Sequence, residues 1–400
     1  MTASLGRIFL KPGRDRTARQ GHPWIFSGAI ARLEPDSPGA GPVEIRSADG
    51  AWLGRGLYCP NAALAVRMYT WREDEPLDPS LFARRLSAAL AWRKQLFPAA
   101  ITDTTACRLA HAEADGLSGL IVDRYADVLS VRVSAAGLLP FLPALLRQLR
   151  AAQPVRAVVV EAEPDAVERE GLDPAAVAAL GDPPPGPVAF RENGLDFTAD
   201  VTAGQKTGFF LDQRDNRARV ARWAAGRRVL SAYCYTGAFE AACARAGATD
   251  ILGLDTSAPA LERAAEHARR NAPAARVVHE RADVPQALRR FRDAARTFDL
   301  IILDPPRFVF SAAQLDRGLR AYKDINLLAL KLLTPGGLLA TFSCSGLVTP
   351  ASFREMFRWA AADSGRRVRI VETFSQPPDH PISPHIPESE YLKGLLAVVE

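Results

Sequence analysis

The sequence lacks the features of a disulfide-stabilised or membrane-spanning protein. Its 400 residues include only five cysteines, an odd number without a Cys-x-x-Cys pair. Such a set supports neither a disulfide framework nor a thiolate zinc site, and it favours a reducing compartment. The longest nearly apolar stretch, 135–146, contains two prolines and is shorter than the roughly 18–20 residues of a membrane-spanning helix. The N-terminal residues have no apolar core of a signal peptide. We therefore expect a cytoplasmic protein with no metal ion and no membrane partner.

The chain also has little excess charge, but that charge is unevenly distributed. With 48% hydrophobic and 24% charged residues, the composition is that of a globular protein and excludes wholesale disorder. Residues 1–32 contain six basic side chains against Asp15 alone, and six minus one equals the whole formal excess of +5. A second cluster places six arginines in residues 214–228 against Asp215 alone. These two segments are candidate surfaces for a polyanion, and ordinary solvated faces are the alternative.

Composition divides the chain into three predicted domains. Residues 1–72 consist of short alternating runs separated by turn signals, a pattern typical of a small all-β unit. Residues 73–185 mix a predicted helix at 79–96 with short apolar strands, which indicates an α+β domain. A Pro-rich segment ends this region, and residues 186–400 begin with a predicted hairpin whose turn is Asn193-Gly194.

From about residue 213 the pattern predicts an α/β fold. Short apolar runs alternate with helical segments, which is typical of a parallel, doubly wound sheet. The last two predicted strands, 368–374 and 395–399, have no helix between them. We expect these two strands to form an antiparallel hairpin at one side of the sheet.

In such a sheet, ligands bind beyond the carboxyl ends of the strands, so the residues after each strand are the candidates. Gly237 follows the first strand without a G-x-G-x-x-G motif, which disfavours a dinucleotide but leaves a simple nucleoside open. Asp255 follows the second strand and suits a ribose diol or a helix cap. Asp283 follows the third and suits an adenine amino group or, again, a helix cap.

The fourth and fifth strands end in more reactive sequences. Asp304-Pro305-Pro306-Arg307-Phe308 combines an acceptor, a stiff donor-poor loop and an aromatic ring, which suits a planar heteroaromatic substrate. Cys344 lies between two serines at the end of the fifth strand, where its thiolate would face Asp304 across adjacent strand ends. Cys234 and Cys243 fit inert core positions. Phe209 and Phe210, which precede the first helix of this region, either line a pocket or belong to the core.

Motifs along the whole chain together carry a family resemblance. In the C-terminal region they are Lys206–Arg217, Cys234–Phe239, Asp304–Phe308, Tyr322–Asn326, Phe342–Gly346, Asp379–Pro381 and Tyr391–Gly394. Nearer the N-terminus they are Gly21–Ala29, Trp52–Tyr58, Arg108–Ala110, Glu113–Leu117 and Val122–Arg124. This combination resembles the bacterial ribosomal large subunit methyltransferase I family.

The resemblance implies an enzyme that forms 5-methylcytosine in 23S rRNA with S-adenosylmethionine (SAM). It implies a Rossmann-like methyltransferase domain, a PUA β-barrel that binds RNA and a central α+β domain. Cys344 would be the nucleophile, with Asp304 assisting. The residues expected to bind SAM are Phe209, Gln213, Tyr235, Thr236, Gly237, Asp255, Asp283, Asp304 and Pro305. Those expected to contact RNA are Arg7, Lys11, Arg14, Lys206, Arg214, Arg307 and Phe308.

The chemistry of cytosine agrees with this interpretation. Carbon-5 becomes nucleophilic enough for methylation only after a thiolate adds to carbon-6, and the base must be unstacked to be reached. The Asp304 motif has no cysteine, so another base must release the enzyme. The alternatives are methylation of uracil carbon-5 or of a guanine nitrogen, and a non-catalytic RNA-binding assembly factor. The oligomeric state stays open, with a homodimer among the alternatives.

Overall fold

The structure is a computed structural model that describes residues 5–35, 39–98, 103–202 and 207–400. It divides into two compact units, which are described separately below. Unit 1 contains Met1–Phe190, Ala199–Phe209 and Pro378–Ser389, and unit 2 contains Arg191–Thr198, Phe210–Pro377 and Glu390–Glu400. Among the described residues, no helix combines the length and the apolar character needed to cross a membrane.

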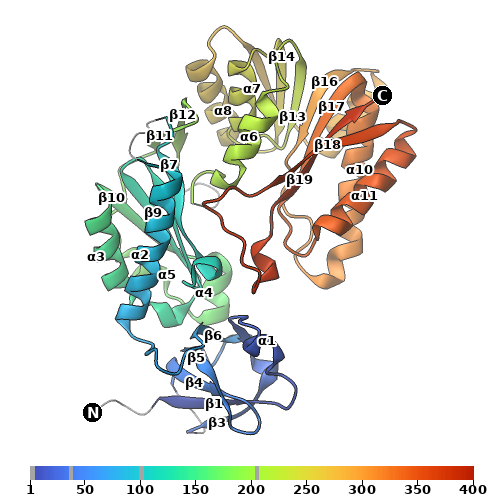
Figure 1. Ribbon diagram of the computed structural model, residues 1–400. Coiled ribbons are helices and arrows are strands. Elements are labelled where there is room, and N and C mark those ends of the chain that lie inside the picture. The colour runs from blue at the N-terminus through green and yellow to red at the C-terminus, as the bar shows by residue number, and fades with distance from the viewer. Residues whose placement is uncertain (1–4, 36–38, 99–102, 203–206) are drawn as a thin grey trace. The chain divides into compact units, whose positions relative to one another are not determined.

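The N-terminal part of unit 1 is a six-stranded sheet (Figure 1). Its strand order is β2-β6-β5-β4-β1-β3, and β1 and β4 are its parallel pair. The alternation predicted within residues 1–72 is confirmed at residues 43–46, because Val43 and Ile45 are buried while Glu44 and Arg46 are not. The elements are β1 (Gly6–Leu10), α1 (Arg16–Arg19), β2 (Trp24–Phe26), β3 (Ile30–Glu34), β4 (Gly41–Arg46), β5 (Trp52–Tyr58) and β6 (Leu64–Thr70).

The central part of unit 1 is a four-stranded sheet of order β10-β9-β8-β7 with accompanying helices. Helix α2 (Pro79–Leu96) has the predicted bounds, and it starts at Pro79 because Asp78 caps it by accepting from the backbone N–H groups of Ser80 and Leu81. The other elements are β7 (Ala106–His111), β8 (Leu120–Tyr125), β9 (Val128–Val133), α3 (Leu142–Ala152), β10 (Ala157–Ala162), α4 (Pro164–Glu170) and α5 (Pro174–Ala178). The α+β character predicted for this region is confirmed.

A two-stranded hairpin, β11 (Val188–Glu192) and β12 (Leu195–Ala199), follows the central sheet in the chain. Asn193 and Gly194 have φ angles of +51° and +74°. Two positive φ angles in a two-residue loop are those of a type I′ turn, as predicted from the Asn-Gly pair.

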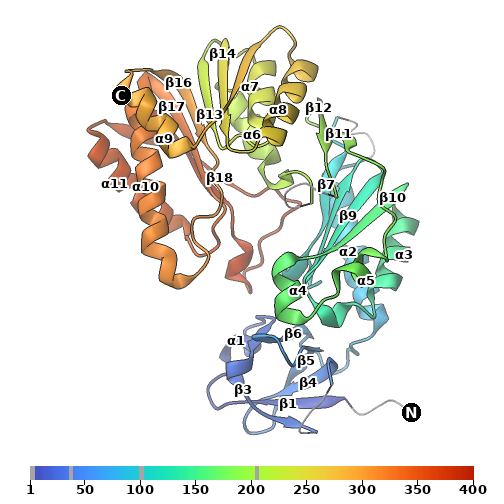
Figure 2. The ribbon, with the colours of Figure 1, turned by 180° about the vertical axis from the view of Figure 1, so that it is seen from behind.

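Unit 2 contains a seven-stranded sheet with helices on both faces (Figures 1 and 2). Its order is β15-β14-β13-β16-β17-β19-β18, with parallel pairing from β15 to β17 and antiparallel pairing of β19 with both neighbours. The doubly wound sheet and its final antiparallel hairpin are therefore confirmed. The strands are β13 (Arg228–Ala232), β14 (Asp250–Asp255), β15 (Arg276–Arg281), β16 (Phe298–Leu303), β17 (Leu333–Ser343), β18 (Val368–Ser375) and β19 (Lys393–Val399).

Apolar side chains on the two faces of this sheet form separate cores. One core joins the strands to α9 (Val284–Asp293), α10 (Leu315–Leu332) and α11 (Pro350–Ser364). The other includes residues of α6 (Arg214–Ala221) and α7 (Ala238–Arg245), and α7 packs against α8 (Ala258–Asn271). Because both faces are covered, the central strands read as continuous apolar runs, and their carboxyl ends provide the free edge for a site.

Candidate catalytic and cofactor site

The loop after β13, residues 233–237, has an unusual backbone. Tyr233 and Tyr235 have φ angles of +62° and +48°, which L-residues with side chains seldom adopt. Gly237 has a φ angle of +75°, and a Cβ atom added to it would lie 2.7 Å from the Cβ of Ala264. Only glycine fits there, so α7 can start immediately after a tight turn at the carboxyl edge of the sheet.

Asp255 at the end of β14 fastens this loop. Its Oδ2 accepts from the backbone N–H of Tyr235 at 2.8 Å, and its Oδ1 accepts from the backbone N–H of Ser257 at 3.0 Å. The cap of α8 is the Ser257 hydroxyl, which accepts from the N–H of Ala260. Asp255 is therefore not the helix cap, and its partly buried carboxylate joins the first two loops of the edge.

A buried histidine that sequence analysis did not single out supports the same loop. The Nε2 atom of His267 lies 3.0 Å from the backbone N–H of Thr198, so it must accept a hydrogen bond there. The proton is then on Nδ1, which donates to the carbonyl of Thr236 at 2.8 Å. Burial lowers the pKa of His267 to about 4, which keeps the ring neutral and this pair of bonds intact.

Asp283 plays the capping role that the sequence offered as one alternative. It is exposed, and its side chain caps α9 by accepting from the backbone N–H of Gln286 at 3.0 Å. The carboxylate also faces Tyr233, whose pKa is raised mainly by burial and also by Asp283.

The segment 304–308, called the Asp304 loop below, follows β16 and is held by a buried amide. Gln213 donates from Nε2 to Asp304 Oδ1 at 2.9 Å, and its Oε1 accepts from Asn216 at 2.7 Å. Gln213 is only 2% exposed, so the structure places this sequence-predicted residue directly against the Asp304 carboxylate. Further along the loop, the ring of Phe308 packs on Tyr322 with centroids 4.7 Å apart.

Cys344 begins the segment 344–348, called the Cys344 loop below, immediately after β17. Its partly buried Sγ atom lies 4.0 Å from the carbonyl oxygen of Pro305 in the Asp304 loop. The two strand ends are thus brought together, as expected from neighbouring parallel strands. The serines that flank Cys344 are tied to one phenol, because Tyr322 bonds the hydroxyls of Ser343 at 2.9 Å and Ser345 at 3.0 Å.

A buried lysine, which the sequence placed in the Tyr391–Gly394 motif without a role, lies beside the Cys344 loop. Lys393 donates from Nζ to the carbonyl oxygens of Ser345 and Val348, each at 2.6 Å. Its signal in the sequence was a lysine at the start of the otherwise apolar strand β19.

The other cysteines of unit 2 are poor nucleophiles. Cys243 is fully buried, and burial raises the pKa of its thiol. The pKa of Cys234 is also well above the usual range, because burial and the neighbouring Glu240 carboxyl both disfavour the thiolate. Cys344 is therefore the better candidate for a nucleophile among the three cysteines of unit 2.

The two phenylalanines in front of α6 have different surroundings. Phe209 is 2% exposed and packs edge-on against Phe190 in unit 1, with centroids 5.0 Å apart. Phe210 packs edge-on against Tyr235 in unit 2, at 5.2 Å. Phe210, which the sequence left between pocket and core, is thus the one that touches the loop around Gly237.

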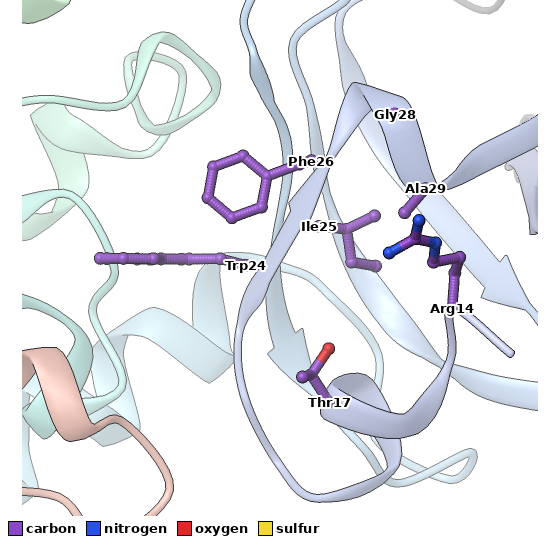
Figure 3. Close-up of a pocket in the computed structure, with 7 residues that line it drawn as sticks. All are labelled: Arg14, Thr17, Trp24, Ile25, Phe26, Gly28 and Ala29. Carbon is purple, nitrogen blue, oxygen red and sulfur yellow. The ribbon is translucent and has the colours of Figure 1, made fainter. Parts of the chain in front are cut away.

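The N-terminal basic segment surrounds a surface hollow in the six-stranded domain (Figure 3). The hollow has a volume of about 310 Å³ and is lined by Arg14, Thr17, Trp24, Ile25, Phe26, Gly28 and Ala29. Phe26 is 54% exposed, an unusual state for a large apolar ring. Lys11 is exposed beside it and donates to the carbonyl of Gly28 at 2.9 Å, and Arg7 is exposed on β1.

The second arginine cluster has less free charge than its sequence indicates. Four of its six members form ion pairs: Arg214 with Asp215, Arg217 with Glu192, Arg219 with Glu372 and Arg228 with Asp299. Arg214 is 5% exposed, whereas Arg307 in the Asp304 loop is exposed. Lys206 lies outside the described residues.

Comparison with known proteins identifies families for the two parts of the chain that contain the carboxyl-edge site and the surface hollow. Residues 144–397 match the model of the S-adenosylmethionine-dependent methyltransferase family, and residues 8–71 match that of a PUA-like domain. The chain is 44% identical over 395 residues to a ribosomal RNA large subunit methyltransferase I from Shewanella frigidimarina, covering 98% of this chain and 99% of that protein. It is 39% identical over 390 residues to the protein of the same name from Erwinia tasmaniensis, covering 97% and 98%.

Solved structures show the same fold. SMU.776, described as a methyltransferase complexed with SAH, has a TM-score of 0.82 at 20% identity, covering 98% of this chain and all of that chain. A SAM-dependent methyltransferase fold from Streptococcus mutans has a TM-score of 0.81 at the same identity. The matches in sequence extend over nearly the full length and include both domains. The chain therefore belongs to the ribosomal RNA large subunit methyltransferase I family and is a SAM-dependent methyltransferase.

Proposed function

We propose that this protein methylates carbon-5 of a cytosine in 23S rRNA, in the cytoplasm, with Cys344 as the nucleophile. The observation that carries the proposal is the position of Cys344. Cys234 and Cys344 are both partly buried at the carboxyl edge of the sheet, but burial and Glu240 raise the pKa of Cys234 well above its usual range. The Sγ of Cys344 instead lies 4.0 Å from the carbonyl oxygen of Pro305 in the Asp304 loop. The rRNA substrate is supported by the names of the relatives.

The carboxyl edge of the sheet fits SAM. Each oxygen of Asp255 accepts one backbone N–H and keeps a second lone pair, so the carboxylate can also accept from the two ribose hydroxyls. The absence of a Cβ at Gly237 lets the loop turn tightly, so that Tyr235 and Thr236 line the ligand. We assign the adenine end to Asp283 and the methionine end to Gln213, Asp304 and Pro305. Phe209 stays a SAM contact proposed from the resemblance, and within unit 1 its ring is buried against Phe190.

Bound SAM supplies a methyl group attached to a positively charged sulfur. The Cys344 thiolate adds to carbon-6 of cytosine, which forms an S–C6 bond and makes carbon-5 nucleophilic enough to take the methyl group. Asp304, when protonated, can donate to ring nitrogen-3, or it can orient the exocyclic amino group as a carboxylate. A base then removes the carbon-5 proton. The C–H electron pair restores the C5–C6 double bond, the S–C6 bond breaks, and its electron pair returns to Cys344.

The RNA has two proposed areas of contact. In the PUA-like domain, Arg14 and Lys11 would bind phosphates, with Arg7 nearby, and the exposed ring of Phe26 would stack on an unpaired base. At the catalytic edge, Phe308 would stack on the target cytosine while Arg307 binds its backbone. Lys206 and Arg214 remain proposed contacts from the sequence, although Arg214 would first have to exchange its partner Asp215 for phosphate.

A covalent trap tests this function. RNA that carries 5-fluorocytosine cannot lose its carbon-5 substituent as a proton, so the S–C6 bond should persist after methyl transfer. We expect a SAM-dependent enzyme–RNA band on a denaturing gel, absent for Cys344→Ala and retained for the matched controls Cys234→Ala and Cys243→Ala. Full methylation by Cys344→Ala would overturn the mechanism.

Analysis of the methylated product separates the alternative substrates. Mass spectrometry of the digested RNA identifies the product as methylated cytosine, uracil or guanine. A nitrogen acceptor needs no nucleophilic cysteine, so a methylguanine product would remain after Cys344→Ala. A non-catalytic assembly factor would give no product, and isothermal titration with SAM would show whether its pocket still binds the cofactor.

A further inference from the structure

Lys393 is a buried cation beside the candidate nucleophile. It starts β19, lies opposite Ser343 in the β17–β19 register, and is only 4% exposed. Its position is therefore fixed one residue away from Cys344, on the neighbouring strand. Lysine is almost never buried to this degree unless it has a partner.

The partners of this ammonium group belong to the Cys344 loop. Nζ donates to the carbonyl oxygens of Ser345 and Val348, each at 2.6 Å. Among the described residues, no carboxylate oxygen lies within ion-pair distance of Nζ. An ammonium group has three N–H donors, so one donor and the full positive charge remain after these two bonds.

The surroundings of Lys393 contain few charges. Burial lowers the pKa of Lys393 to about 8, whereas Cys344 and Glu390 raise it and Arg307 lowers it further. Cys344 also faces Tyr322, whose pKa is raised mainly by burial. The ammonium form of Lys393 therefore predominates at pH 7, and Cys344 is among the few groups that can neutralise its charge.

We infer that Lys393 holds the Cys344 loop and stabilises the thiolate form of Cys344. The inference rests on the proposed function, because it explains how the nucleophile of that reaction becomes ionised. An unperturbed thiol is only a few per cent thiolate at pH 7, so a buried positive charge nearby raises the reactive fraction directly. Lys393 acts through Cys344 and is a positioning residue.

The test measures the thiol itself and needs no RNA. The full-length protein is treated with iodoacetamide between pH 6 and 10, and the alkylation rate of the Cys344 peptide is followed by mass spectrometry. We expect Lys393→Met to slow alkylation about tenfold at pH 7, as for a rise of about one unit in the thiol pKa. At pH 10 the rates of variant and wild type should converge, because the thiol is then ionised in both.

Two further variants distinguish charge from packing. Lys393→Arg keeps the positive charge and should retain most of the wild-type rate at pH 7. Lys331→Met removes an exposed lysine of α10 and should leave the profile unchanged. A Lys393→Met profile that coincides with wild type, or that is displaced equally at every pH, would overturn the inference.

The inference can be tested even if Lys393→Met does not fold. The alkylation profile of the wild-type protein then decides, because a Cys344 thiol that titrates at or above the ordinary value of about 8.5 contradicts the inference. Failure of the proposed function looks different. If Cys344→Ala still methylates RNA while Lys393→Met alters the thiol profile, the electrostatic pairing stands and the nucleophile is wrong.

Discussion

The hydroxyl of Thr207 donates a 2.5 Å hydrogen bond to the carboxylate of Asp123, a residue of β8 that lies 84 positions earlier in the chain. Asp123 is fully buried and also receives two bonds of 2.8 Å from the guanidinium of Arg108. The central domain thus holds Thr207, which lies on the segment that leads into α6. Both residues lie in motifs that carry the family resemblance, but nothing in the sequence indicated that they contact each other.

This relationship predicts a graded loss of stability. Thr207→Val keeps the shape of the side chain but removes the donor, and should lower the free energy of unfolding by about 1–2 kcal/mol. Asp123→Ala leaves the buried Arg108 guanidinium without its counterion and should cost about 3–5 kcal/mol. Urea unfolding would measure both, with the exposed Thr373→Val as the matched control. Equal stabilities of Thr207→Val and Thr373→Val would contradict the prediction.

Asp255 should contribute to SAM affinity in addition to its role in the loop. We expect Asp255→Ala to weaken SAM binding by about 1.5–3 kcal/mol, since hydrogen bonds to a charged group are lost. Ser257→Ala removes the cap of the adjacent helix and serves as the control, because it should lower stability while leaving SAM affinity nearly unchanged. Isothermal titration measures both. An unchanged dissociation constant for Asp255→Ala would reduce this residue to a structural role.

The buried carboxyl of Glu240 should make the protein less stable as the pH rises. Burial raises its pKa from 4.5 to about 7, so the folded state holds a proton that the unfolded state releases above about pH 4.5. Stability is therefore lost progressively between about pH 4.5 and 7. Glu240→Gln mimics the protonated form and should be more stable than wild type at pH 8, by up to about 3 kcal/mol. Urea unfolding at pH 5 and 8 tests this, with the exposed Glu262→Gln as control.

His267 should produce the opposite slope. Its pKa is lowered from 6.5 to about 4 by burial, so below pH 6.5 the unfolded state takes up a proton that the folded state refuses. Stability should fall as the pH decreases from about 6.5 to 4. His267→Gln removes this proton uptake and should flatten that part of the curve, whereas the exposed His385→Gln should not. The two variants at Glu240 and His267 separate effects that partly cancel in the wild type.

The hollow of the PUA-like domain gives two distinguishable RNA-binding predictions. Arg14→Ala should weaken binding to RNA of any sequence. It should also reduce the slope of log K against log salt concentration by about one, which corresponds to the loss of one phosphate contact. Phe26→Ala should weaken binding by about 1–3 kcal/mol, the usual value of a base stacked on an aromatic ring, without changing that salt slope. Filter binding at several salt concentrations measures both, with the exposed Trp359→Ala as control. Identical salt slopes for Arg14→Ala and wild type would exclude a phosphate contact.

Much of the fold could be predicted because it depends on local patterns. The start of α2 follows from Asp78 and Pro79, and the turn of the β11–β12 hairpin follows from Asn193-Gly194. Strand β7 (Ala106–His111) could not be found in this way, because Arg108 and His111 interrupt its apolar pattern. Both side chains are nevertheless buried, since the Asp123 carboxylate directly opposite on β8 compensates the charge of Arg108, and His111 Nδ1 lies 3.0 Å from the same guanidinium.

The site was predictable where a residue directly follows a strand. Asp255, Asp304 and Cys344 lie at the carboxyl edge because strand ends determine that position. The roles of His267 and Lys393 could not be predicted because they depend on hydrogen bonds to carbonyl groups of distant loops. Periodicity carries no information about such bonds, which form only after the helices and strands have packed.

The order of strands at one side of the sheet constrains when that side can form during translation. β18 is made before β19, yet β19 lies between β17 and β18 in the sheet. During translation β18 therefore has no neighbour in this sheet until Lys393–Val399 has emerged. Lys393, which donates hydrogen bonds to the Cys344 loop, belongs to that late strand. A nascent chain that already contains Cys344 therefore still lacks the buried cation that lies beside it.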